Sequence, residues 1–216
     1  VDSKGNKFQL RGISTHGINW DVGSPYVNKK AFKTLRDDWG VNAIRLAMYT
    51  EEYNGYCSGG SQAKLRKLVD KGVGYATDLG MYAIIDWHIL SDGNPNKNKS
   101  QAKKFFTTMA KKYKNNKNVI YEICNEPNGC SWKEIKSYAT DIIKTIRKYD
   151  KKAVIIVGTP TWSQLGTDGT SNEVADSPIK GYKNIMYSLH FYASEWAHNE
   201  YLPAKVAYAR KKKLQN

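Results

Sequence analysis

The chain has 216 residues, of which 40% are hydrophobic and 25% are charged. This composition is ordinary for a folded globular domain, and no apolar run reaches the roughly 20 residues that a membrane-spanning helix needs. The net charge of +14 raises the question of nucleic-acid binding, but the lysines are spread along the chain and many fall in helical stretches, as at positions 103, 104, 111, 112 and 114. We therefore expect a basic, solvated surface with neither a nucleic-acid nor a membrane partner.

Three cysteines, Cys57, Cys124 and Cys130, leave at least one thiol unpaired. None stands in the Cys-x-x-Cys spacing that is typical of zinc or redox sites. Cys57 and Cys130 both fall in loop-like segments, so a bridge between them and free thiols are both open. The sequence starts at Val1 without a charged-then-apolar leader, so we expect any secretion signal to have been removed or never to have been present.

Short apolar runs rich in β-branched residues recur along the chain and predict buried strands. They cover residues 8–13, 41–46, 82–86, 119–123, 154–157 and 185–189. Between them lie stretches with apolar residues three or four positions apart, which predict amphipathic helices over residues 32–39, 65–79, 102–113 and 135–146. Ser131 and Glu134 have the spacing of a capping box before the last of these helices.

Alternating strands and helices predict a parallel sheet, and the strand starts from the second onward are about 30 to 40 residues apart, the span of one βα unit. An open doubly wound sheet would satisfy the same pattern, but the glycine-rich phosphate loop of that fold is absent. The sequence therefore favours a (β/α)8 TIM barrel as a single domain over residues 1–216. Because this length is below the roughly 250 residues usual for eight units, we expect an incomplete barrel with about six βα units.

In a parallel barrel the side chains that do chemistry project from the carboxyl ends of the strands, where every βα loop opens. Read in chain order, these ends carry His16, Arg45, Asp86, Trp87, His88, Asn125, Glu126, Trp162, His190 and Tyr192. A central carboxylate, an arginine, several imidazoles and exposed rings suit a carbohydrate site, because sugar faces stack on rings and hydroxyls take fixed polar partners.

Four segments also carry a family resemblance: residues 10–17 (Leu-Arg-Gly-Ile-Ser-Thr-His-Gly), 84–88 (Ile-Ile-Asp-Trp-His), 120–127 (Ile-Tyr-Glu-Ile-Cys-Asn-Glu-Pro) and 190–193 (His-Phe-Tyr-Ala). They resemble bacterial-type endoglucanases of glycoside hydrolase family 5, in order and over essentially the whole chain. Asn-Glu-Pro alone recurs among related barrel glycosidases, whereas its combination with Asp-Trp-His and His-Phe-Tyr-Ala is specific.

The resemblance implies a secreted, retaining endo-β-1,4-glucanase that cleaves internal bonds of cellulose-type β-glucans without a cofactor. It makes Glu126 the general acid/base and Asn125 the neighbour that hydrogen-bonds the sugar 2-hydroxyl. The implied supporting shell around the cleaved linkage is Arg45, His88, His190 and Tyr192. The implied cleft for successive glucose units is lined by His16, Trp20 and Trp162.

Retention needs two carboxyl groups about 5 to 5.5 Å apart, one protonated and one ionised. In the family the ionised nucleophile is a glutamate in a Ser/Thr-Glu-Phe/Trp-Gly setting on the seventh strand, which we expect beyond Asn216, and Arg45 is expected to lie nearer to it than to Glu126. Glu195 stands in a similar Ser-Glu-Trp-Ala setting, but it follows the sixth strand at once, and this position argues against it. Six units would leave the edges of the first and sixth strands unpaired, so we expect a fragment that is cut, cleaved or completed by a second chain.

Other interpretations of the same residues stay open. Glu126 is either the acid/base or a structural partner of Arg45, and Trp20 and Trp162 either bind sugar or pack under loops. A metal site made by the histidines with Asp86 is disfavoured, because no His-x-x-x-His or similar spacing occurs. We expect Asp86 to support the catalytic residues through hydrogen bonds, and Trp39 and Trp132 to serve packing.

Two alternatives to the cellulase interpretation also stay open. The same fold and machinery would serve a mannanase, a xyloglucanase or a mixed-linkage glucanase. The chain would instead be a catalytically dead carbohydrate-binding protein if it has no nucleophile.

Overall fold

A computed structural model of the chain describes residues 6–165 and 172–214. Six strands within these residues form one parallel sheet, in the order β1-β2-β3-β4-β5-β6. They are β1 (Gly12–Ser14), β2 (Ala43–Tyr49), β3 (Tyr82–His88), β4 (Val119–Glu122), β5 (Val154–Val157) and β6 (Ile185–Tyr187). Every strand pairs with the next one in the sequence and the order never reverses, which is the arrangement of a barrel wall and not of a doubly wound sheet. The expected fold, a partial α/β barrel, is confirmed.

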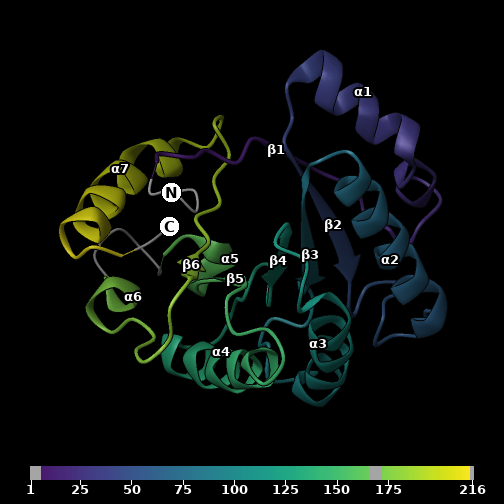
Figure 1. Ribbon diagram of the computed structural model, residues 1–216. Helices are drawn as coiled ribbons and strands as arrows, with labels where there is room; N and C mark the ends of the chain where they lie inside the picture. Colours follow the sequence, from purple (N-terminus) through teal and green to yellow (C-terminus); the bar gives the residue numbers. More distant parts are fainter. Residues whose placement is uncertain (1–5, 166–171, 215–216) are drawn as a thin grey trace.

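The helices form an arc around the strands, as Figure 1 shows. They are the 3-10 helix η1 (Ser24–Tyr26), α1 (Lys29–Trp39), α2 (Gln62–Asp78), α3 (Lys99–Tyr113), α4 (Trp132–Arg147), α5 (Pro160–Ser163), α6 (Glu173–Asp176) and α7 (Trp196–Lys211). The four predicted helices correspond to α1 to α4. The predicted capping box is present at α4, where the Ser131 hydroxyl accepts a hydrogen bond from the Glu134 N–H and the Glu134 carboxylate accepts one from the Ser131 N–H.

The two faces of the sheet differ in burial. Residues that point toward the helices, among them Ile85, Trp87 and Ile155, are fully buried. Residues on the opposite, inner face, among them Ile84 and Ile156, are only half-buried. The core therefore lies between the sheet and its helices, while the inner face is open in the described part of the chain.

The structure departs from the expectations at the first strand, at Trp39 and at α7. The first strand is the short segment Gly12–Ser14 and not residues 8–13, and it is exposed, because it pairs with β2 alone among the described residues. Trp132 is buried as expected, but Trp39 at the end of α1 is 71% exposed and lines an open groove between β1 and α1. Helix α7 was not predicted, since Pro203 interrupts its sequence and its apolar residues follow no clear helical face.

The structure shows the state of the three cysteines. Cys57, Cys124 and Cys130 are all free thiols, so the Cys57–Cys130 bridge is not formed. Burial raises the pKa of Cys57 to about 12 and that of Cys130 to about 11, so both stay protonated at neutral pH.

Within the described residues, no helix is long and apolar enough to cross a membrane.

Candidate active site

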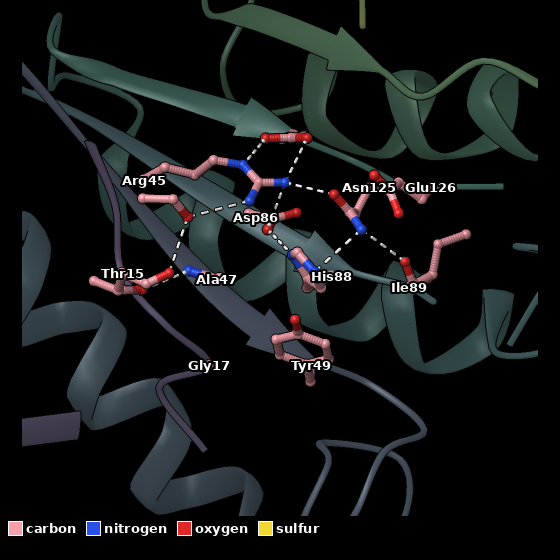
Figure 2. A network of polar contacts seen from close by, with 12 residues as sticks. Thr15, Gly17, Arg45, Ala47, Tyr49, Asp86, His88, Ile89, Asn125 and Glu126 are labelled. Atoms are coloured by element: carbon pink, nitrogen blue, oxygen red, sulfur yellow. Dashed lines mark hydrogen bonds and ion pairs between the residues drawn. The ribbon is translucent and has the colours of Figure 1, made fainter. Parts of the chain in front are cut away.

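A buried charged group lies near the carboxyl ends of β2, β3 and β4. Asp86 and Glu122 stand opposite each other in the register of β3 and β4. Arg45 on β2 donates from Nε and Nη2 to the two oxygens of Glu122 at 2.7 and 2.9 Å, and Nη2 also lies 2.9 Å from Asp86 Oδ2 (Figure 2). Burial opposes the positive charge of Arg45, but the two carboxylates outweigh it, and the pKa of Arg45 is raised above its ordinary value.

Asn125 and His88 extend this group toward the loops that follow the strands. Asn125 Oδ1 accepts a hydrogen bond from Arg45 Nη2 at 2.7 Å, and Asn125 Nδ2 donates to the carbonyl of Ile89 at 3.0 Å and lies 3.1 Å from His88 Nε2. The other ring nitrogen, His88 Nδ1, lies 2.5 Å from Asp86 Oδ2. Asn125 and His88 are both buried, so their side chains are held in one arrangement (Figure 2).

Glu126 follows Asn125 and lines a cavity of about 370 Å³. Its Oε1 lies 2.7 Å from Nδ1 of His190, which comes from the segment after β6. Arg45 makes its ion pairs with Glu122 and Asp86, and among the described residues it makes no direct hydrogen bond or ion pair with Glu126. Glu126 is therefore not part of the salt bridges that Arg45 makes with Glu122 and Asp86, and its side chain lines the cavity.

The cavity wall brings together several of the residues singled out from the sequence. It is lined by Leu90, Glu126, Trp162, Gln164, His190, Phe191, Tyr192, Glu195 and His198. Tyr192 lines the cavity but is 68% exposed, and its ring stacks on His198 at a centroid distance of 6.3 Å. Glu195 is an exposed residue at the N-cap of α7, which agrees with the expected loop position.

Trp162 reaches the cavity from a tight turn after β5. Thr161, Trp162 and Ser163 all have positive φ, between 52° and 62°, a conformation that is costly for residues with a side chain. Two hydrogen bonds tie this turn to the segment around Glu126: the Trp162 N–H donates to the carbonyl of Pro127 at 3.0 Å, and the Ser163 hydroxyl donates to that of Asn125 at 2.5 Å. The indole is 45% exposed, so Trp162 is not packed under a loop.

His16 and Trp20 lie on the other side of the charged group and connect to it through Tyr49. The ring centroids are 5.6 Å apart for His16 and Trp20, 4.6 Å for Trp20 and Tyr49, and 4.0 Å for Tyr49 and His88. Trp20 is half-buried and its Nε1–H donates to the carbonyl of Tyr53 at 2.6 Å. These rings form a continuous aromatic row that ends at His88.

Tyr49 and Glu122 were missed by the sequence analysis. Tyr49 is the last residue of β2 and shares a face with Arg45, four positions earlier, so strand periodicity would have found it. Glu122 stands in an apolar run that predicts a strand, and its pairing with Arg45, 77 residues away, is visible only in the sheet register. Within the two described stretches, no group of three or more His, Cys, Asp or Glu side chains could hold a metal ion.

Comparisons with known proteins agree with this geometry. Residues 1–215 match the family model described as cellulase, glycosyl hydrolase family 5. Endoglucanase A of Butyrivibrio fibrisolvens is 52% identical over 196 residues, which make up 89% of this chain and 43% of that protein. The chain therefore spans less than half the length of this curated relative.

Solved structures give the same result. The cellulase Cel5C_n has a TM-score of 0.92 and 40% sequence identity, with 100% of this chain and 65% of that chain covered. A variant of the catalytic domain of Thermobifida fusca endoglucanase Cel5A, solved in complex with cellotetraose, has a TM-score of 0.80 and 35% identity, with 99% of this chain and 79% of that chain covered. With its parallel barrel strands, its Asn-Glu pair at the end of β4 and a family match over residues 1–215, the chain belongs to the cellulases of glycoside hydrolase family 5.

Proposed function

We propose that this chain carries the acid/base of a retaining endo-β-1,4-glucanase, with Glu126 as that residue. The observation that supports this most directly is the placement of Glu126 at the end of β4, with one oxygen 2.7 Å from His190 and its side chain lining a cavity with Trp162 and Tyr192. A general acid must reach the oxygen of the scissile bond, and an anchored but partly accessible carboxyl meets that requirement. The Thermobifida fusca Cel5A variant that was solved with cellotetraose supports a β-1,4-glucan as the substrate.

The chemistry proceeds in two steps. In the first, the Glu126 carboxyl gives its proton to the glycosidic oxygen as the bond from that oxygen to the anomeric carbon breaks, and a second carboxylate attacks the anomeric carbon. In the second, the Glu126 carboxylate takes a proton from water as the water oxygen bonds to the anomeric carbon and the bond from that carbon to the second carboxylate breaks, which restores both carboxyl groups. Since His190 holds Oε1, the other oxygen of Glu126 is the one that exchanges the proton.

We assign the second carboxylate to a residue outside the described part of the chain, as the resemblance to family 5 enzymes implies. Asp86 and Glu122 are buried and both are paired with Arg45, so neither is available to attack a sugar. Glu195 lines the cavity, but it is exposed at the start of α7 and a nucleophile needs a fixed position. Within residues 6–165 and 172–214, Nη1 of Arg45 makes only a 3.3 Å contact, to Ser14, so that edge of the guanidinium is the one that can face an added carboxylate.

Two further assignments belong to this proposal. Residues 1–216 belong to a single catalytic domain, of which they are a fragment, because the buried apolar residues from Ile18 to Leu214 make one continuous core. The protein acts outside the cell, because a long glucan chain does not cross a membrane. The aromatic row of His16, Trp20 and Tyr49 and the ring of Trp162 lie on either side of the charged group and supply stacking surfaces for successive glucose units.

The test is the Glu126→Gln variant of the full-length protein, so that the second carboxylate is present, assayed for reducing ends from a soluble cellulose derivative and for cellotetraose binding. We expect hydrolysis to fall by about 10²- to 10⁴-fold, the usual contribution of a general acid, while cellotetraose still binds. Glu200→Gln, at an exposed position of α7 outside the cavity wall, is the matched control and should retain activity. Equal turnover of the Glu126 variant would reject the assignment, and binding by the unsubstituted full-length protein without hydrolysis would favour the carbohydrate-binding alternative.

A further inference from the structure

Four side chains of the buried group close a ring of polar contacts. Arg45 contacts Asn125 and Asp86, Asn125 contacts His88, and His88 contacts Asp86. Two members have fixed chemistry, because a guanidinium can only donate hydrogen bonds and an ionised carboxylate can only accept them. The other two members, the Asn125 amide and the His88 imidazole, can each be turned or protonated in two ways.

The fixed members determine the other two. Because Arg45 donates, the Asn125 atom at 2.7 Å from it must be the amide oxygen, and the amide nitrogen then faces Ile89 and His88. His88 Nε2 must accept from that amide nitrogen, so the imidazole proton resides on Nδ1. There it is donated to Asp86 Oδ2 at 2.5 Å. Turning the amide round would set its N–H2 against the guanidinium, donor against donor.

We propose that Asp86 is a positioning residue that fixes the tautomer of His88 and, through it, the orientation of Asn125 beside Glu126. Asp86 is fully buried and is not part of the cavity wall, so it acts only through its neighbours. Both of its polar contacts use Oδ2, whereas Oδ1 has no hydrogen-bond partner among the described residues. A buried carboxylate with one unpaired oxygen is costly, which is consistent with selection for what its other oxygen holds in place.

Loss of this acceptor would disturb the residue next to the acid. Without Asp86 Oδ2, the His88 proton is free to move to Nε2, where it points at the amide nitrogen of Asn125. Arg45 prevents Asn125 from turning in response, so the contact opens and the Asn125 side chain loses its fixed position. Small displacements of positioned groups cost up to about 100-fold in rate, so we expect Asp86→Ala to lower kcat by about 10- to 100-fold with KM changed by less than about 2-fold. This effect on hydrolysis rests on the proposed function, whereas the tautomer does not.

The direct test is the nitrogen NMR spectrum of the full chain labelled with ¹⁵N-histidine. The chain has 4 histidines, so the spectrum is simple, and the His88 signals are those lost in His88→Gln. In the unsubstituted protein we expect His88 as the neutral form protonated on Nδ1. Asp86→Asn should keep this form, because Arg45 forces the oxygen of the new amide into the place of Oδ2, whereas Asp86→Ala should lose it.

Glu122→Gln is the matched control, since Glu122 is also a buried carboxylate on Arg45 but does not contact His88. It should leave the His88 signals on Nδ1. A proton on Nε2 in the unsubstituted protein, an unchanged tautomer in Asp86→Ala, or its loss in Asp86→Asn or Glu122→Gln would each overturn the inference. The measurement needs no substrate, and its first arm needs only the assignment variant His88→Gln, so a chain that hydrolyses nothing, or an Asp86→Ala variant that fails to fold, still leaves the inference tested.

Discussion

The guanidinium of Arg45 on β2 and the carboxylate of Glu122 on β4 meet across β3 through two hydrogen bonds of 2.7 and 2.9 Å. The Arg45 side chain is 18% exposed and that of Glu122 is 4% exposed, so water screens the pair little. The buried positive charge of Arg45 is balanced by the carboxylates of Glu122 and Asp86. Arg45 also donates a hydrogen bond to Asn125. The pair therefore couples the stability of the sheet to the geometry of the site.

Glu122→Ala should lower the free energy of unfolding by about 3–5 kcal/mol, because it leaves a buried arginine with half of its compensating charge. The measurement is urea unfolding followed by tryptophan fluorescence. Asp37→Ala, which removes the partner of Lys33 and Arg36 in a surface cluster, is the control and should have a much smaller effect. Equal losses in the two variants would mean that the buried pair has no special role.

Gly158, directly after β5, is required by a close approach of two backbone segments. A Cβ atom at this position would lie 2.3 Å from the carbonyl oxygen of Cys124 and 3.0 Å from that of Asn125. Gly158→Ala should therefore destabilise the fold by roughly 1–3 kcal/mol and reduce hydrolysis, because backbone next to Glu126 has to move. Thermal unfolding measures the loss of stability, and the rate of hydrolysis of a soluble cellulose derivative measures the loss of activity.

Gly74 offers the opposite case within the same chain. It lies inside α2, and a Cβ atom there would meet nothing within 4 Å. Gly74→Ala should stabilise the protein by roughly 0.5–1 kcal/mol, because alanine favours the helix and loses less freedom on folding. A destabilised Gly74 variant would show that the Gly158 result reflects general intolerance of added side chains.

The sequence predicted the middle of the fold better than its edges. Strands β2 to β6 and helices α1 to α4 were found because buried β-branched runs and one-sided apolar spacing have a direct physical cause in burial. The ends of β2 and β3 were placed too early, since Tyr49 and His88 are polar site residues that a hydrophobic run does not include. Trp39 fits the helical spacing of α1 but lies where the groove beside β1 is open.

The site was predicted as a set of residues but not as a set of contacts. Strand ends identify Arg45, His88, Asn125 and Glu126, because a parallel barrel gathers its strand ends on one face. They do not show that Glu126 contacts His190 while Asn125 contacts Arg45. Such pairings depend on register and side-chain direction, which a single sequence does not reveal.

Trp162 should contribute to substrate affinity more than to stability. Its indole is 45% exposed and lines the cavity with Glu126, so it offers a stacking face to a sugar ring. We expect Trp162→Ala to raise KM by about 2- to 10-fold, equivalent to about 0.5–1.5 kcal/mol of stacking, with kcat changed less. Trp39→Ala removes an indole that is 71% exposed outside the cavity, and KM should not change. A fall in kcat alone for Trp162→Ala would assign the ring to the chemical step.

Asp92 should make stability depend on pH in the direction opposite to that of a salt-bridged carboxylate. It is 8% exposed, and its oxygens accept hydrogen bonds from Thr50 at 2.6 Å and Asn98 at 2.9 Å. Burial outweighs these bonds and raises the pKa of Asp92 above its ordinary value of 3.8.

As pH rises from 3.8 to the raised pKa, the unfolded chain loses the Asp92 proton before the folded protein does. The contribution of Asp92 to the free energy of unfolding is therefore present below this pH window and is lost across it. Asp92→Asn stays neutral, so the stability of the unsubstituted protein relative to this variant should fall with pH in urea unfolding from about pH 3.5 to 7. A relative stability that rises over this range would show that the hydrogen bonds outweigh burial.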